Sequence, residues 1–138
     1  MLFRSYLPEP ARLVGEARRV LRPGGILIAE FTQMRPHDPA LHDYFRYTRE
    51  GAAWLLERAG FEILESRPIG GLMARVGLSS IAALNRINRG PTRVLTEIPV
   101  WLLYVLIQVA FEALDRLLFD PRECLGHLLV ARAPAAGP

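Results

Sequence analysis

Residues 11–30 constrain the fold of this chain more than any other segment. Apolar residues recur at every third or fourth position over residues 11–22, which places them on one side of an α-helix. A Pro-Gly-Gly turn at 23–25 ends that helix. The apolar run 26–31 has no polar alternation, so it predicts a strand covered on both faces, as in a parallel sheet. Because a crossover helix follows an earlier strand, we expect the chain to be the later part of a larger α/β domain.

The remainder of the chain predicts further helices and strands. Thr48 suits the N-cap of a helix, and Gly60 stands where a Schellman ending needs a left-handed residue, with Phe61 folding back onto the last turn. The strand that follows is broken by Pro-Ile-Gly-Gly at 68–71. The later elements are expected, in order, at 48–59 (helix), 61–66 (strand), 72–87 and 99–119 (helices) and 125–132 (strand).

Charge and cysteine content exclude some classes of function. The net charge is +3, and all 17 basic residues are arginines, scattered along the chain and largely balanced by 14 acidic residues. Nucleic-acid-binding proteins gather basic residues on one face, so we expect no nucleic-acid partner. Cys124 is the only cysteine. No internal disulfide can therefore form, which fits the reducing cytoplasm.

The loop at 32–47 is the best candidate for a substrate-facing site, because ligands of open α/β sheets bind beyond the carboxyl ends of the strands. Its His, Tyr, Asp and Arg side chains suit general-base and orienting roles. The candidate catalytic residues are His42 and Tyr47, and the candidate substrate-binding residues are Glu30, His37, Arg46 and Tyr47. The alternatives are structural: a backbone hydrogen bond for His42, packing or helix capping for Arg46 and Tyr47, and an arginine partner for Glu30.

The other titratable residues suggest little chemistry. His37 and His42 have no cluster of cysteines or carboxylates to complete a coordination sphere, so we expect no metal site. His127 falls within the last predicted strand, where we expect a structural role. No histidine is predicted beside Cys124, so we do not expect that thiol to be a nucleophile.

A second functional candidate is the apolar run 98–107. A membrane-spanning helix needs about 20 apolar residues, and polar residues interrupt this run from Gln108 onward. Trp101 and Tyr104 near one end suit an interfacial anchor. The helix predicted from Pro99 to Phe119 therefore has four interpretations. It could be a membrane span, a peripheral membrane contact, a cap over the active-site side that selects a hydrophobic acceptor, or a helix packed onto the one predicted at 72–87.

Three segments resemble class I S-adenosylmethionine-dependent methyltransferases of the type 11-like small-molecule group. Residues 16–31 (EARRVLRPGGILIAEF) resemble the helix, Pro-Gly-Gly turn and fifth strand of that family. Residues 42–63 (HDYFRYTREGAAWLLERAGFEI) resemble its next cap, helix and sixth strand. Residues 125–133 (LGHLLVARA) resemble its closing antiparallel strand. The general family pattern does not account for the stretch from 72 to 123.

The resemblance implies a partial Rossmann-like α/β fold. The chain would hold the last three strands of a seven-stranded sheet, with a helical insertion before the final antiparallel strand. Residues 1–5 would be a remnant of the fourth strand or its following loop. The implied organisation is an α/β core at 1–71, an apolar helical insertion or cap at 72–123, the closing strand at 124–133 and a disordered tail at 134–138.

The resemblance also implies methyl transfer from S-adenosylmethionine to a small, lipid-like acceptor. The family's Gly-rich cofactor loop follows a strand, whereas the Pro-Gly-Gly turn here follows a helix, and the acidic residue that holds the cofactor ribose has no counterpart. We therefore expect no cofactor-binding residue in this chain. We expect the isolated chain to be inactive and its cofactor-binding N-terminal half to be missing.

The alternative function is a non-catalytic module, cytoplasmic or membrane-associated. Its partner would be a membrane surface at the helix from Pro99 to Phe119, or a second chain docked on the unpaired edge of the strand at 26–31. An unpaired apolar strand edge promotes association. We therefore expect a partner for either function, whether the missing half or a second copy of the chain.

Overall fold

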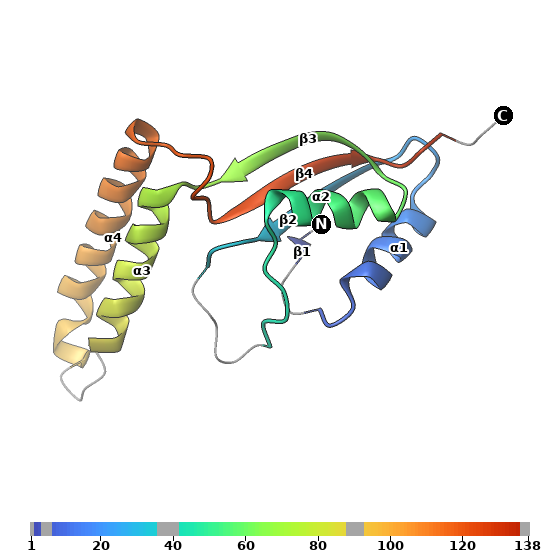
Figure 1. The fold of residues 1–138 in the computed structure, drawn as a ribbon. Coiled ribbons are helices and arrows are strands. Elements are labelled where there is room, and N and C mark those ends of the chain that lie inside the picture. Colours follow the sequence, from blue (N-terminus) through green and yellow to red (C-terminus); the bar gives the residue numbers. More distant parts are fainter. Residues whose placement is uncertain (1, 4–6, 36–41, 88–92, 136–138) are drawn as a thin grey trace. The chain divides into compact units, whose positions relative to one another are not determined.

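Four strands form a mixed sheet in the computed structural model of the chain, which describes residues 2–3, 7–35, 42–87 and 93–135 (Figure 1). The strand order is β1-β2-β4-β3. β1 is parallel to β2, and β4 is antiparallel to both of its neighbours, β2 and β3. β2 and β3 therefore run in the same direction and end at one edge of the sheet. The strand bounds are Leu2–Phe3 (β1), Ile26–Thr32 (β2), Glu62–Ile69 (β3) and Gly126–Arg132 (β4).

The sheet confirms the expected antiparallel closing strand, and its fourth strand, β1, lies within residues 1–5, where a strand remnant or its following loop was expected. Leu2 and Phe3 of β1 pair with Glu30 and Phe31 of β2. The expectation of an unpaired β2 edge is therefore wrong at those two positions. The register of β2 with β4 is continuous over the whole of β2.

The chain divides into two units. The sheet unit comprises Met1–Ile69 and Gly126–Pro138, and the hairpin unit comprises Gly70–Leu125. Ile69 at the end of β3 pairs with Gly126 at the start of β4. The polypeptide therefore leaves and re-enters the sheet at one place. Of the tail predicted as disordered, residues 136–138 lie outside the described residues.

Two helices build the core of the sheet unit against one face of the sheet. They are α1 (Pro10–Val20) and α2 (Arg49–Arg58), and both follow from the apolar spacing of their sequences. Pro10 opens α1, where its missing N–H is no loss. The side chains buried in this core are those of Val14 and Ala17 in α1, Ala52, Leu55 and Leu56 in α2, Leu27, Ala29, Phe31, Leu129 and Ala131 in the sheet, and Phe61 and Ala133 next to strand ends.

The burial of β2 alternates, which corrects the prediction that both of its faces are covered. Leu27, Ala29 and Phe31 are buried. Ile26 and Ile28, which alternate with them along the strand, are about half exposed. Side chains of a strand point alternately to its two faces, and α1 and α2 supply side chains to only one of these. The lack of polar alternation in the sequence was therefore misleading for this chain.

Both ends of α2 have the predicted chemistry. Thr48 Oγ1 accepts a hydrogen bond from the amide of Gly51 at 3.1 Å, as an N-cap does. At the other end, Gly60 has a φ of +85° and donates to Glu57 O at 2.9 Å, and Phe61 donates to Leu56 O at 3.1 Å. These two bonds make a Schellman ending, so this prediction is confirmed.

β3 is longer than predicted, because Pro68 lies within it instead of ending it. The strand continues to Ile69, and Pro68 pairs in register with His127 of β4. β3 is the last strand of the sheet order, so the side of Pro68 away from β4 needs no ladder donor. Proline is tolerated at such edge positions.

Two helices form the hairpin unit. α3 spans Leu72–Ile87, as predicted, and α4 spans Arg93–Leu117. The helices approach closely at Gly77, where an added Cβ would lie 2.8 Å from Phe111 Cβ. Tyr104 of α4 also donates its hydroxyl to Asn85 Oδ1 of α3 at 2.7 Å. These contacts join α4 to α3 along one side.

The bounds of α4 correct the prediction that this helix starts at Pro99 and ends at Phe119. The helix begins six residues earlier, so Pro99 lies inside it. Residues 93–98 (RVLTEI) contain no glycine or proline, which explains why the helix extends back to Arg93. Proline inside a helix removes one donor of the hydrogen-bond ladder. This cost did not break the helix here.

Candidate functional site

The loop after β2 begins and ends at the same point of the sheet. The backbone amide of Tyr47 donates to the carbonyl of Thr32, the last residue of β2, at 2.9 Å. The described loop residues 33–35 and 42–46 therefore lie beside the edge at which β2 and β3 end. Such an edge is where open α/β sheets hold their ligands.

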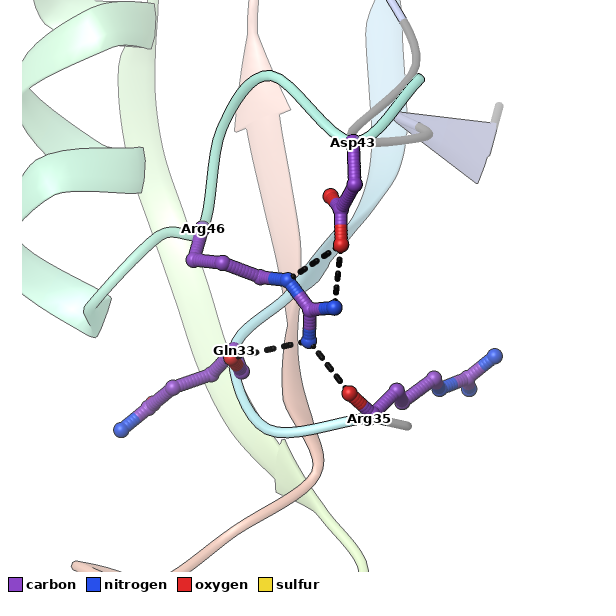
Figure 2. A network of polar contacts seen from close by, with 4 residues as sticks. All are labelled: Gln33, Arg35, Asp43 and Arg46. Carbon is purple, nitrogen blue, oxygen red and sulfur yellow. Dashed lines mark hydrogen bonds and ion pairs between the residues drawn. The ribbon is translucent and has the colours of Figure 1, made fainter. Parts of the chain in front are cut away.

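Arg46 ties the two sides of this loop together (Figure 2). Its Nε donates to Asp43 Oδ2 at 2.8 Å, and its Nη2 contacts the same oxygen. Its Nη1 donates to the backbone carbonyls of Arg35 at 2.7 Å and Gln33 at 3.5 Å. The planar guanidinium presents five donors in a fixed geometry, so one side chain fixes three acceptors. Arg46 therefore organises the loop itself.

Arg35 is held at both its backbone and its side chain. Its carbonyl accepts from Arg46, and its Nη2 makes an ion pair with Glu30 Oε1 at 2.8 Å. The Glu30 side chain is 22% exposed and that of Arg35 is 45% exposed. Glu30 thus has the arginine partner that was the structural alternative for it. Both charges stay accessible at the end of β2.

Tyr47 packs inward at the end of the loop. Its ring meets Phe31 edge-on, with centroids 5.2 Å apart, and lies tilted against Phe45 at 6.1 Å. Among the described residues, the buried hydroxyl oxygen of Tyr47 has no hydrogen-bond partner. Burial raises the pKa of this phenol. In this conformation Tyr47 cannot touch a ligand through its hydroxyl.

A contact that the sequence did not predict joins His127 to Gln33. His127 is 5% exposed, and its Nε2 lies 2.5 Å from Gln33 Oε1. Burial lowers the pKa of His127, the Glu50 carboxylate opposes that shift and Arg49 adds to it. The register pairs His127 with Phe31, which brings it to the edge where the loop begins. The expected structural role of His127 is consistent with this burial. The contact with Gln33 joins residues that are 94 positions apart, so no local sequence pattern could have revealed it.

The predicted catalytic residue His42 is exposed. Its imidazole stacks on Tyr44 with ring centroids 5.9 Å apart and an angle of 16° between the planes. Tyr44 and Phe45 are 50% and 41% exposed. These residues give the loop an aromatic surface carrying an accessible imidazole. His37, the remaining predicted substrate-binding residue, lies outside the described residues.

The chain offers no glycine-rich cradle at its Pro-Gly-Gly turn. The amide of Gly24 donates to Ala133 O at 3.0 Å, and that of Gly25 donates to Arg22 O at 2.8 Å. These donors are used within the chain, so the turn does not fit the carboxylate or ribose of a nucleoside cofactor. Over the described ranges, no group of three or more His, Cys, Asp and Glu side chains could hold a metal ion.

Comparison with known proteins shows the fold. No protein-family model matches the chain, and no curated protein matches its sequence. The solved structure of the [4+2]-cyclase SpnF matches with 21% identity and a TM-score of 0.53, covering 98% of this chain and 48% of the cyclase. The chain thus spans about half the length of that protein. At this identity the likeness shows a shared fold.

Two further matches are structures of Haemonchus contortus phosphoethanolamine N-methyltransferase 2. The complex with S-adenosyl-L-methionine is 11% identical, with a TM-score of 0.44 over 96% of this chain and 31% of the enzyme. The complex with phosphomonomethylethanolamine and S-adenosylhomocysteine is 13% identical, with a TM-score of 0.43 over 97% of this chain and 32% of the enzyme.

Proposed function

We propose that this chain is the acceptor-side part of a cytoplasmic S-adenosylmethionine-dependent methyltransferase. The observation that carries the proposal is the sheet: β4 runs antiparallel between β2 and β3, which are parallel to each other. The methyltransferase resemblance of residues 16–31, 42–63 and 125–133 falls on these strands. The fold shared with half of a cyclase supports the same architecture.

The cofactor-binding half would lie outside these 138 residues. The amides of Gly24 and Gly25 are bonded within the chain, and the sequence contains no G-x-G-x-x-G motif. S-adenosylmethionine would supply the electrophilic methyl group. The residues of this chain would bind and orient the acceptor and exclude water from it.

The loop after β2 would do this work. The exposed rings of His42, Tyr44 and Phe45 suit a small apolar acceptor, and the charges of Glu30 and Arg35 border the same loop. The accessible imidazole of His42 is the better of the two predicted catalytic candidates, since the Tyr47 hydroxyl is buried. His42 would take the proton that the acceptor loses on methylation. Arg46, Gln33 and His127 would position the loop.

The proposal is tested on the polypeptide that carries these residues in its natural host, isolated through a C-terminal tag. It is incubated with S-adenosylmethionine tritiated in the methyl group and with an organic extract of the host cells. We expect label in an extractable product, and a loss of about ten-fold or more in His42→Gln. The matched control Arg58→Gln, on α2, should transfer label at the unaltered rate.

Two outcomes would overturn the proposal. The first is that the folded polypeptide transfers no label. This outcome counts whether or not the polypeptide forms a product of unchanged mass, as a cyclase would. The second concerns the 138-residue chain by itself: tight binding of S-adenosylmethionine in calorimetry would contradict the assignment of the cofactor site to another segment.

A further inference from the structure

The helix α4 carries two apolar stripes, and α3 covers only one of them. The covered stripe runs through Val100, Tyr104, Ile107 and Phe111 to Asp115, all of which are at least partly buried. The second stripe has the spacing i, i+3, i+4, i+7, i+8, i+11 and lies on the other side of the helix. We call it the exposed stripe; its residues, with their exposed fractions, are Ile98 (75%), Trp101 (61%), Leu102 (56%), Val105 (42%), Leu106 (65%) and Val109 (62%).

The length and composition of α4 suit a lipid environment. By these two criteria the segment Ile98–Leu117 could cross a membrane, and the side chains of the exposed stripe within it are 42–75% exposed. The exposed stripe itself extends for about 16 Å along the helix. Contiguous apolar surface of this kind marks a site for a partner or a membrane.

The charges on α4 indicate that the helix lies on a bilayer instead of crossing it. Glu112 and Arg116 continue the exposed stripe at helical spacing and form an ion pair at 3.0 Å, with side chains 57% and 78% exposed. The stripe is therefore apolar up to Val109 and charged beyond it. An interfacial helix buries one apolar face to the depth of the headgroup–acyl boundary and keeps its charges in water.

Polarity distinguishes a lipid surface from a protein partner. A protein interface carries about one hydrogen bond per 100–200 Å² and has a polar rim. Within the exposed stripe the only polar group is the indole N–H of Trp101. Tryptophan is the residue that concentrates at the membrane–water boundary. The stripe therefore matches the boundary of a bilayer better than it matches a folded protein.

Basic residues flank the exposed stripe in the sequence. Arg86, near the end of α3, is exposed. Between Asn85 and Ile98 the sequence contains Arg86, Arg89 and Arg93 against one acid, Glu97. Arginines beside an apolar helix attract anionic lipid headgroups.

We propose that α4 binds the surface of an anionic lipid bilayer through the exposed stripe. The binding goes beyond the proposed methyl transfer and does not depend on it. The stripe inserts below the headgroups, Trp101 lies at the boundary, and the exposed Arg86 contacts the headgroup charges. The chain is then held where lipid-like molecules are concentrated.

Co-sedimentation tests the proposal. The 138-residue chain is pelleted with vesicles of equal parts phosphatidylcholine and phosphatidylglycerol, and with vesicles of phosphatidylcholine alone. We expect stronger binding to the anionic vesicles, and affinity lowered by about ten-fold or more in Trp101→Glu. The matched control is Trp54→Glu on α2, which makes the same change at a tryptophan that is 56% exposed. It should bind like the unaltered chain.

Fluorescence gives a test that needs no charged substitution. The chain has two tryptophans, so Trp54→Phe leaves Trp101 as the only one. On addition of the anionic vesicles its emission should shift to the blue, and phosphatidylcholine with brominated acyl chains should quench it. Circular dichroism of each variant checks that the helices are retained.

Three results would overturn the proposal. One is a folded chain that neither pellets with anionic vesicles nor shows the Trp101 shift. Another is equal binding by the unaltered chain and Trp101→Glu. The third is a dimer in sedimentation velocity without vesicles, with Trp101 already shielded from iodide, because a second copy would then cover the stripe. None of these results bears on methyl transfer, which the labelling experiment measures separately.

Discussion

The carboxylate of Asp115 accepts a hydrogen bond from the backbone amide of Gly71 at 2.7 Å, across 44 residues of sequence. It also accepts from the amides of Met73 at 2.9 Å and Ala74 at 3.1 Å. The first amides of a helix have no partner within the helix. A side chain near the end of α4 therefore supplies the N-terminal cap of α3, and this polar contact closes the hairpin unit at one end.

Substitution of Asp115 by alanine should destabilise the hairpin unit. Asp115 is 8% exposed, so its loss leaves three backbone donors without their acceptor, at a cost of about 1–3 kcal/mol in the free energy of unfolding. Urea unfolding followed by circular dichroism measures this cost. The control Glu112→Gln removes an exposed ion pair and should change stability by less than about 0.5 kcal/mol. Equal losses in the two variants would contradict this role of the cap.

The substitution of glycine by alanine should have opposite effects at two positions. Gly60 has a φ of +85°, where a Cβ is strained, so Gly60→Ala should lower stability by about 1 kcal/mol. Gly15 lies within α1 with open space around its Cα, so Gly15→Ala should raise stability by about 0.5–1 kcal/mol. Thermal unfolding of the two variants tests the pair, and a shift of the same sign in both would refute it.

The stability of the sheet unit should fall as the pH is lowered. Burial lowers the pKa of His127 below its ordinary value of 6.5, so the unfolded chain binds a proton more readily than the folded chain. The contribution of His127 is therefore complete above about pH 6.5 and is lost as the pH falls towards its folded pKa. Urea midpoints measured between about pH 7.5 and about pH 5 should show this slope. His127→Gln should reduce the slope. Identical slopes in the unaltered chain and in His127→Gln would exclude the effect.

The loop after β2 should loosen when Arg46 is replaced by lysine. Lysine can pair with Asp43, but its single ammonium group cannot also reach the carbonyls of Gln33 and Arg35 in the fork geometry of arginine. We expect chymotrypsin to cut at the exposed Tyr44 or Phe45 several-fold faster. Arg12→Lys alters an exposed pair with Glu9 and should leave the rate of cutting unchanged. Unaltered cutting in Arg46→Lys would show that the loop does not depend on the guanidinium.

Local chemistry made the elements of the sheet unit predictable. The caps at Thr48 and Gly60 act within a few residues, so the sequence contains all that they need. The predicted end of β3 and the predicted burial of β2 were wrong, because tertiary packing decides both. Pro68 is tolerated because β3 is an edge strand, and the one-sided burial of β2 depends on where the helices pack.

The candidate site was predictable by position but not by contact. The loop lies at the carboxyl end of β2, as the order of elements indicated. The bond between His127 and Gln33 depends on the pairing of β2 with β4, which no local pattern encodes. The guanidinium of Arg46 is engaged within the loop, and its sequence position alone did not distinguish that role from contact with a ligand.

The pairing of Ile69 with Gly126 also has an evolutionary consequence. Because the last residue of β3 and the first residue of β4 face each other in an antiparallel ladder, a tight two-residue turn could join them directly. The 56-residue segment Gly70–Leu125 could therefore be gained, lost or exchanged by descent without altering the strand order or its register. Lineages that share this sheet are free to differ in what they carry at that junction.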